Sequence, residues 1–118
     1  KDITAAEFNG IISDNDIVLV DFWASWCGPC RAFAPTFTAS SEKHPDVFHA
    51  KVDTEAEQAL ASAAEIQAIP TLMAFKKGQL VFRHSGMLAA NQLDEVISQI
   101  KEFDIDAAMA EKGDGTDA

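Results

Sequence analysis

Cys27 and Cys30 are the only two cysteines of this 118-residue chain, and they lie in the tetrapeptide Cys-Gly-Pro-Cys. Residues 17–23, just before them, are mostly β-branched or aromatic without polar alternation, and Asp21 is the one anomaly; this pattern predicts a strand covered on both faces. Pro29 favours the first turn of a helix, where its missing N–H is not needed. The sequence therefore predicts a buried strand that leads, through the cysteines, directly into a helix.

The rest of the chain alternates between helical and strand patterns. We predict helices over residues 4–13, 31–43, 54–64 and 93–103, and strands over residues 47–52, 71–76 and 80–84. Thr4 with Glu7, and Thr54 with Glu57, have the spacing of a capping box at a helix start. Pro35 should interrupt and kink the second helix.

Lys77-Gly78, between the last two predicted strands, is a hairpin signal and requires these strands to be antiparallel. Strands that are joined through helices are instead expected to be parallel. We therefore predict an α/β fold with a central mixed β-sheet flanked by helices on both faces.

Chain length and composition indicate one folded domain over residues 1–103. Residues 104–118 form an acidic C-terminal tail, with five acidic residues and one lysine. This tail has two interpretations: a segment whose end is disordered, or a short helix capped at Asp106 and stopped at Gly113.

Charge and hydropathy exclude several classes of function. A net charge of −10 repels a phosphate backbone, so we expect no nucleic-acid partner. The longest apolar run, residues 17–24, is too short to span a bilayer, and no signal-peptide pattern opens the chain. We expect a soluble cytoplasmic protein without a membrane partner.

Three kinds of site use a Cys-x-x-Cys pair. A purely structural disulfide would stabilise the fold weakly, because the loop that it closes is short. A zinc site would need two more ligands at suitable spacing, and His44, His49 and His84 stand apart from one another in the sequence, so we predict no metal. A redox role fits the pair best.

The two thiols have different predicted roles. Cys27 stands just before the helix, where free N–H groups and the macrodipole favour a thiolate, so it is the expected nucleophile. Cys30, about one turn inside, is shielded by its own helix and is the expected resolving thiol. The predicted reaction is thiol–disulfide exchange through a mixed disulfide on Cys27.

The Trp-Cys-Gly-Pro-Cys motif at residues 26–30, the preceding Val-Asp-Phe-Trp-Ala at residues 20–24, Pro35, and the Ile-Pro-Thr at residues 69–71 closely resemble bacterial-type thioredoxins. The resemblance extends from about residue 3 to residue 103. It implies a thioredoxin fold in which Pro70 is cis and faces the cysteines. It also implies that the backbone of Ile69 binds an extended substrate strand. The implied docking surface comprises Trp26, Gly28, Pro29, Ile69, Pro70 and Gly86.

The resemblance assigns roles to further residues. Asp21 matches the family's buried carboxylate, and Lys51 matches the lysine near it; a strand-end salt bridge and a solvated strand residue are the simpler interpretations. Trp23 is expected to pack beneath the site. Arg31 is either the family's basic residue or an ordinary surface charge. Ala89 replaces a common Ser or Thr helix cap, so that the cap shifts to Asn91 or is absent.

Three functions remain open at this point. The favoured one is a monomeric general protein disulfide reductase, a redox protein with no cofactor besides its Cys27–Cys30 disulfide. Its electrons would come from NADPH through a separate thioredoxin reductase, and its substrates would be protein disulfides. The alternatives are an exported thiol oxidant or isomerase, and a non-catalytic binding subunit that uses the same surface.

Overall fold

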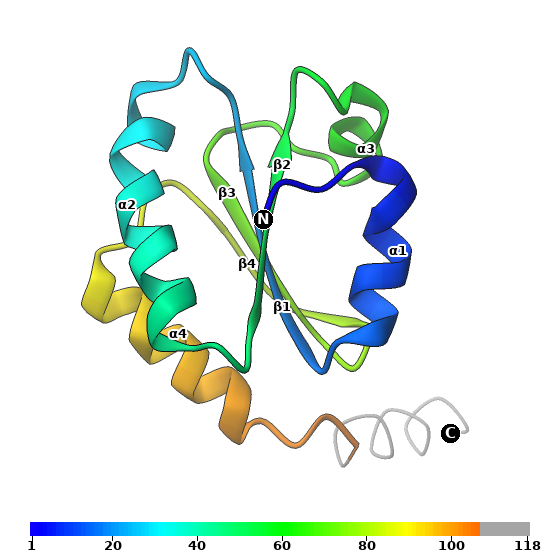
Figure 1. Ribbon diagram of the computed structural model, residues 1–118, viewed down its shortest axis with the longest axis vertical. Coiled ribbons are helices and arrows are strands. Elements are labelled where there is room, and N and C mark those ends of the chain that lie inside the picture. The colour runs from blue at the N-terminus through cyan, green and yellow to red at the C-terminus, as the bar shows by residue number, and fades with distance from the viewer. Residues whose placement is uncertain (107–118) are drawn as a thin grey trace, which may run out of the picture.

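The computed structural model describes residues 1–106. The elements along the chain are α1 (Ala5–Asp14), β1 (Ile17–Trp23), α2 (Gly28–Lys43), β2 (Phe48–Asp53), α3 (Gln58–Ala63), β3 (Thr71–Lys76), β4 (Gln79–Ser85) and α4 (Ala90–Glu102). The strands form one sheet in the order β2-β1-β3-β4 (Figure 1). Within the described residues, no helix has the length and apolar character needed to cross a bilayer.

The sheet is mixed, as the sequence predicts. β1 runs parallel to β2 and antiparallel to β3, and β3 and β4 form the predicted hairpin. At its turn, Lys77 and Gly78 both have positive φ, 50° and 79°, the conformation that a tight two-residue hairpin turn requires. β1 is therefore a central strand with neighbours on both edges, and it ends at the cysteine loop.

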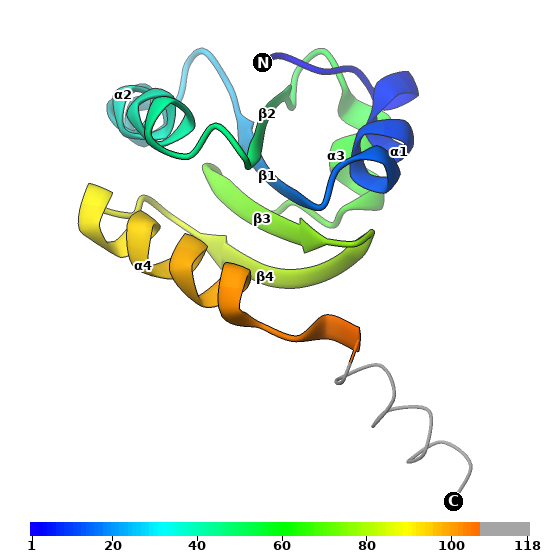
Figure 2. The ribbon, with the colours of Figure 1, turned by 60° about the horizontal axis from the view of Figure 1, so that its bottom comes forward.

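Helices cover both faces of the sheet, with α2 and α4 on one face and α1 and α3 on the other (Figure 2). Side chains alternate along β1, so its residues contribute to both cores. The core beneath α2 and α4 contains Ile17, Leu19, Phe33, Phe37, Val47, Leu72, Ala74, Leu88, Leu93, Ile97 and Ile100. The opposite core contains Ile3, Val18, Val20, Phe22, Ala50, Val52 and Met73. The two cores hold β1 rigidly from both sides.

The predicted start of α3 is wrong. The helix begins at Gln58, after Glu57, and no capping box forms between Thr54 and Glu57. The Thr54 hydroxyl instead donates to the Trp23 carbonyl oxygen at 3.0 Å, and a Glu57 carboxylate oxygen accepts from the Ala5 N–H at 2.8 Å. Both side chains therefore hold neighbouring elements rather than their own helix.

The other predicted helices fall close to their observed positions. The Glu7 carboxylate accepts from the Thr4 N–H at 3.0 Å at the start of α1, as its capping-box spacing predicts. α2 continues through Pro35. At α4, Ala89 occupies the N-cap position and has no side-chain acceptor, although Gln92 accepts from its N–H at 2.9 Å. The serine or threonine cap is therefore absent and does not move to Asn91.

The C-terminal end of α4 is fixed by a buried lysine. The ammonium group of Lys76, on β3, donates to the carbonyl oxygens of Ile100, Lys101 and Phe103 at 2.7, 3.0 and 2.7 Å. Phe103 itself is 43% exposed, whereas Ile105 is 4% exposed. Packing thus extends two residues beyond the predicted domain end. The rest of the predicted tail, residues 107–118, lies outside the described residues.

Ile105→Ala is expected to destabilise the fold by about 2 kcal/mol, because truncating a buried aliphatic side chain costs about 2–5 kcal/mol and this site lies at the margin of the core. Urea unfolding measures the change. Leu80→Ala is the matched control, since Leu80 is 51% exposed and should change stability by less than about 0.5 kcal/mol. Equal stabilities of the two variants would show that Ile105 contributes no packing energy.

Candidate functional site

The cysteine pair lies where β1 leads into α2. Cys27 is the N-cap of α2, and Gly28 and Pro29 are its first two residues. Cys27 and Cys30 form a disulfide, with Cα atoms 5.2 Å apart. The two side chains are 5% and 3% exposed, so a partner must bring its own disulfide down to this surface.

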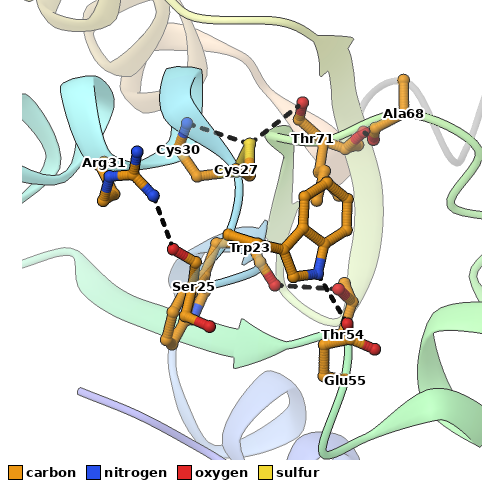
Figure 3. The surroundings of a disulfide bond; sticks show 11 residues. Trp23, Ser25, Cys27, Cys30, Arg31, Thr54, Glu55, Ala68 and Thr71 are labelled. Atoms are coloured by element: carbon orange, nitrogen blue, oxygen red, sulfur yellow. Dashed lines mark hydrogen bonds between the residues drawn. A yellow bond between two sulfur atoms is a disulfide. The ribbon is translucent and has the colours of Figure 1, made fainter.

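The start of α2 directs positive potential at Cys27. The N–H of Cys30 donates to the Cys27 sulfur at 3.2 Å, and Figure 3 shows this contact across the first turn. A helix N-terminus stabilises a thiolate formed there by these N–H groups and by the macrodipole. Arg31 donates to the Ser25 carbonyl oxygen at 2.8 Å and so holds the loop before the cysteines (Figure 3).

The Ile69–Pro70 peptide bond is cis, as the resemblance implies. The Ile69 carbonyl oxygen lies 3.7 Å from the Cys27 sulfur. The N–H of Gly86 donates to the Pro70 carbonyl oxygen at 2.7 Å, and Gly86 has a φ of 105°, which strains any residue with a side chain. The structure thus brings Ile69, Pro70 and Gly86 together beside Cys27.

An apolar surface surrounds the buried sulfurs. Trp26 is 65% exposed on one side, and Gly28 and Pro29 are exposed at the helix start. Met87 is 44% exposed directly after Gly86. An exposed apolar patch of this kind is typical of a surface that binds other proteins. Sequence reasoning missed Met87, because no pattern separates it from a core methionine.

Trp26 and Ile69 also line a shallow hollow of about 180 Å³, together with Thr54, Ala61, Ile66, Gln67 and Ala68. The indole N–H of Trp26 donates to the Glu55 carboxylate at 2.6 Å. Glu55 is a second residue that sequence reasoning missed, since it lies 29 residues from Trp26 in the chain. It fixes the orientation of the exposed indole ring.

Asp21 is buried in the middle of β1, 1% exposed, and neither carboxylate oxygen has a hydrogen-bond partner within the described residues. It shares a strand face with Ile17 and Leu19, the face that α2 covers. Lys51 lies opposite Asp21 in the β1–β2 register. Burial raises the pKa of Asp21 to about 6, and the positive charge of Lys51 opposes part of that rise.

Lys51 also contacts the second tryptophan. Its ammonium group lies 4.9 Å from the centroid of the Trp23 ring, a cation–π contact. Trp23 is partly buried and packs against the cysteine cluster, as expected for a residue beneath the site. The structure therefore joins Asp21, Lys51, Trp23 and the cysteines into one continuous region.

The histidines lie in unrelated environments. Among residues 1–106, no group of three or more His, Cys, Asp or Glu side chains is placed to hold a metal ion. His49 is buried, with Nε2 2.9 Å from the Ser40 hydroxyl and Nδ1 3.0 Å from the Val47 carbonyl oxygen. His44 lies 3.1 Å from Asp94. These contacts hold α2 against β2 and α4.

Comparison with known proteins shows the family to which the chain belongs. The family model described as thioredoxin matches residues 1–101. The chain belongs to the thioredoxin family. A Streptomyces coelicolor relative named as a thioredoxin is 43% identical over 105 residues, which cover 89% of this chain and 78% of the relative. Thioredoxin-1 of Saccharomyces cerevisiae is 40% identical over 83 residues, which cover 70% of this chain and 81% of the relative.

Solved thioredoxin structures agree with this assignment. Plasmodium falciparum thioredoxin superposes with a TM-score of 0.78 and 33% identity, covering 84% of this chain and 97% of that protein. Fasciola hepatica thioredoxin superposes with a TM-score of 0.76 and 38% identity, covering 81% of this chain and 93% of that protein. The thioredoxin fold, the Cys27–Cys30 disulfide and the family together identify a thioredoxin that acts as a disulfide reductase.

Proposed function

We propose that this thioredoxin reduces disulfides of other proteins with Cys27 as the nucleophile. The Cys27 thiolate attacks one sulfur of the substrate disulfide, a mixed disulfide forms, and the other substrate sulfur leaves as a thiolate that takes up a proton. Cys30 then attacks the Cys27 sulfur. The second substrate thiolate leaves, and the Cys27–Cys30 disulfide forms again. Two electrons pass to the substrate, which gains two protons.

Asp21 is the proposed proton acceptor for Cys30. The Cys30 thiol must lose its proton before it attacks the mixed disulfide, and a carboxylate with a pKa of about 6 is ionised near neutral pH. Asp21 takes this proton directly or through a water molecule. Lys51 supports the ionised carboxylate by its charge.

The docking surface binds substrates without recognising particular side chains. The Ile69 backbone binds an extended substrate segment, while Trp26, Gly28, Pro29, Pro70 and Gly86 give an apolar platform. A nearly flat apolar surface suits a protein that meets many different disulfides.

The oxidised protein is recharged by a separate thioredoxin reductase that uses NADPH. That reductase attacks the Cys27–Cys30 disulfide by the same exchange chemistry and returns two electrons. We propose that the protein works in this cycle as a cytoplasmic monomer. Family membership and the single redox disulfide support this proposal.

An exported oxidant or isomerase is the second candidate. Gly28 and Pro29 disfavour it, since oxidising relatives usually have a histidine at the position of Pro29. The reduction potential of the Cys27–Cys30 pair separates the two candidates. A potential of about −270 mV, the general reference value for thioredoxin, would support the reductase, and a potential of about −120 mV would support the oxidant.

Insulin reduction with NADPH and thioredoxin reductase tests the proposal. We expect NADPH oxidation that depends on this protein and on insulin, and Cys27→Ser should abolish it. If the wild-type protein accepted no electrons from NADPH and reductase, the cycle would be wrong. If Cys27→Ser and Cys30→Ser variants kept full biological function, the protein would instead be a non-catalytic binding subunit.

A further inference from the structure

We propose that Arg83, on the edge strand β4, is a positioning residue for disulfide exchange. It fixes the start of the docking loop, which we define as residues 64–70, between α3 and β3. This inference rests on the protein disulfide reductase activity proposed above. Arg83 does not touch the sulfurs; it acts through the loop that lies beside them.

The docking loop begins with a strained helix end. The N–H of Glu65 donates to the Ser62 carbonyl oxygen and the N–H of Ile66 to the Ala61 carbonyl oxygen, each at 3.0 Å. This is the Schellman pattern, in which the left-handed residue is usually glycine. Here it is Glu65, with a φ of 56°. A non-glycine residue in this conformation costs roughly 1 kcal/mol, so other contacts must hold it.

Arg83 supplies those contacts. Its guanidinium donates from Nη1 to the Ala64 carbonyl oxygen at 2.7 Å and from Nη2 to the Glu65 carbonyl oxygen at 2.6 Å. Carbonyl groups at a helix C-terminus lack helical partners and carry partial negative charge. The planar guanidinium, with two parallel donors, matches two successive carbonyl oxygens in a way that a single ammonium cannot.

The other end of the loop is fixed by the same strand. The Pro70 carbonyl oxygen accepts from the Gly86 N–H at 2.7 Å, directly after β4, and the Thr71 hydroxyl lies 3.2 Å from the Ser85 hydroxyl. Between these attachments, Gln67 and Ala68 are exposed. The docking loop is therefore held at both ends by β4, and its exposed middle has a local contact, in which the Ala68 carbonyl oxygen accepts from the Thr71 hydroxyl.

The exposed middle of the loop is the part that would face a substrate. Ile66, Gln67, Ala68 and Ile69 form one wall of the hollow beside Trp26. The Ile69 carbonyl oxygen then lies next to the Cys27 sulfur. Releasing the loop at Arg83 lets this wall move, while the disulfide and the Cys30 N–H bond to the Cys27 sulfur at the start of α2 remain. Arg83 should therefore affect substrate binding more than sulfur chemistry.

Arg83→Met, which keeps the stem and removes the guanidinium, tests the proposal. We expect KM for insulin to rise about five-fold with little change in kcat, as a loss of about 1 kcal/mol in substrate binding would produce. The reduced variant should react with the small reagent 5,5′-dithiobis(2-nitrobenzoic acid) at the wild-type rate, because that reagent does not need the loop. Amide hydrogen exchange at Glu65 and Ile66, whose N–H groups donate to the Ser62 and Ala61 carbonyl oxygens, should become faster.

Two further variants separate positioning from charge and stability. Lys77→Met removes one positive charge at the far end of the β3–β4 hairpin and should leave KM unchanged. Arg83→Lys keeps the charge but loses the two parallel N–H donors of the guanidinium, so its KM should lie between those of the wild type and Arg83→Met. An Arg83→Met protein with wild-type KM, or with equal losses on insulin and on the small reagent, overturns the proposal. A wild-type protein that reduces neither substrate would instead overturn the proposed function.

Discussion

Replacing Cys30 with serine is expected to stop turnover and to leave substrate covalently bound to Cys27. The first exchange still occurs, because Cys27 keeps its position at the start of α2. The second exchange cannot occur, since no thiol stands one turn away to attack. Intramolecular attack gains a large effective concentration, so insulin turnover should fall by about two orders of magnitude or more.

Non-reducing electrophoresis and mass spectrometry measure the trapped species. Each adduct should release its substrate and Cys30→Ser protein on treatment with dithiothreitol. Cys27→Ser is the matched control: it retains Cys30, which is 3% exposed and shielded by its helix, and should capture little. Greater capture by Cys27→Ser than by Cys30→Ser would reverse the assigned roles of the two thiols.

Local sequence signals were sufficient to predict the centre of this fold. β1 follows from an apolar run that only Asp21 interrupts, the start of α2 from Pro29, and the β3–β4 hairpin from Lys77-Gly78. Each of these signals acts within a few residues, so the neighbouring sequence is enough to determine the backbone conformation there. The strand, the cysteine loop and the helix that make the site are all of this local kind.

The errors in the predicted helix boundaries arose where contacts with a distant element, and not the local sequence, decide the structure. Glu57 has the spacing of a capping box, but its carboxylate accepts from Ala5, 52 residues away. Phe103 continues the apolar periodicity of α4, yet the helix ends at Glu102 and the ring is exposed, while Ile105 is buried. A periodic pattern does not indicate where its helix stops.

The same limit applies to the site. Glu55 at Trp26, and Arg83 at the docking loop, are exposed polar residues without any motif, and only the tertiary structure shows their partners. Asp21 could be recognised as unusual because it interrupts an apolar strand. The lack of a hydrogen-bond partner for its carboxylate among residues 1–106, and the position of Lys51 over Trp23, required the structure.

Asp21→Asn should stabilise the fold at neutral pH. The pKa of Asp21 is raised from 3.8 to about 6, so the folded state binds this proton more tightly than the unfolded state. The stabilising contribution of the protonated group is complete below pH 3.8, is lost as pH rises to about 6, and stays lost above that. A shift of this size corresponds to about 3 kcal/mol.

Urea unfolding of both proteins at several pH values measures this contribution. The advantage of Asp21→Asn should be small near pH 4 and should grow to a plateau above about pH 7, somewhat below 3 kcal/mol because the buried amide also lacks partners. Asp16→Asn, at an exposed carboxylate, is the control and should show no such rise. A constant difference at all pH values would mean that the Asp21 carboxylate is not destabilised by burial.

The same substitution should slow the second exchange step. An amide cannot accept the Cys30 proton, and a positioned general base contributes about 10²–10⁴-fold in typical enzymes, so resolution of the mixed disulfide should slow by about ten-fold or more near pH 7. Stopped-flow tryptophan fluorescence separates this step from the first attack, which should keep its rate. A more stable protein with unchanged resolution would show that Asp21 has no part in proton transfer. Greater stability together with slower resolution would show that the fold tolerates a costly buried carboxylate because the reaction needs it.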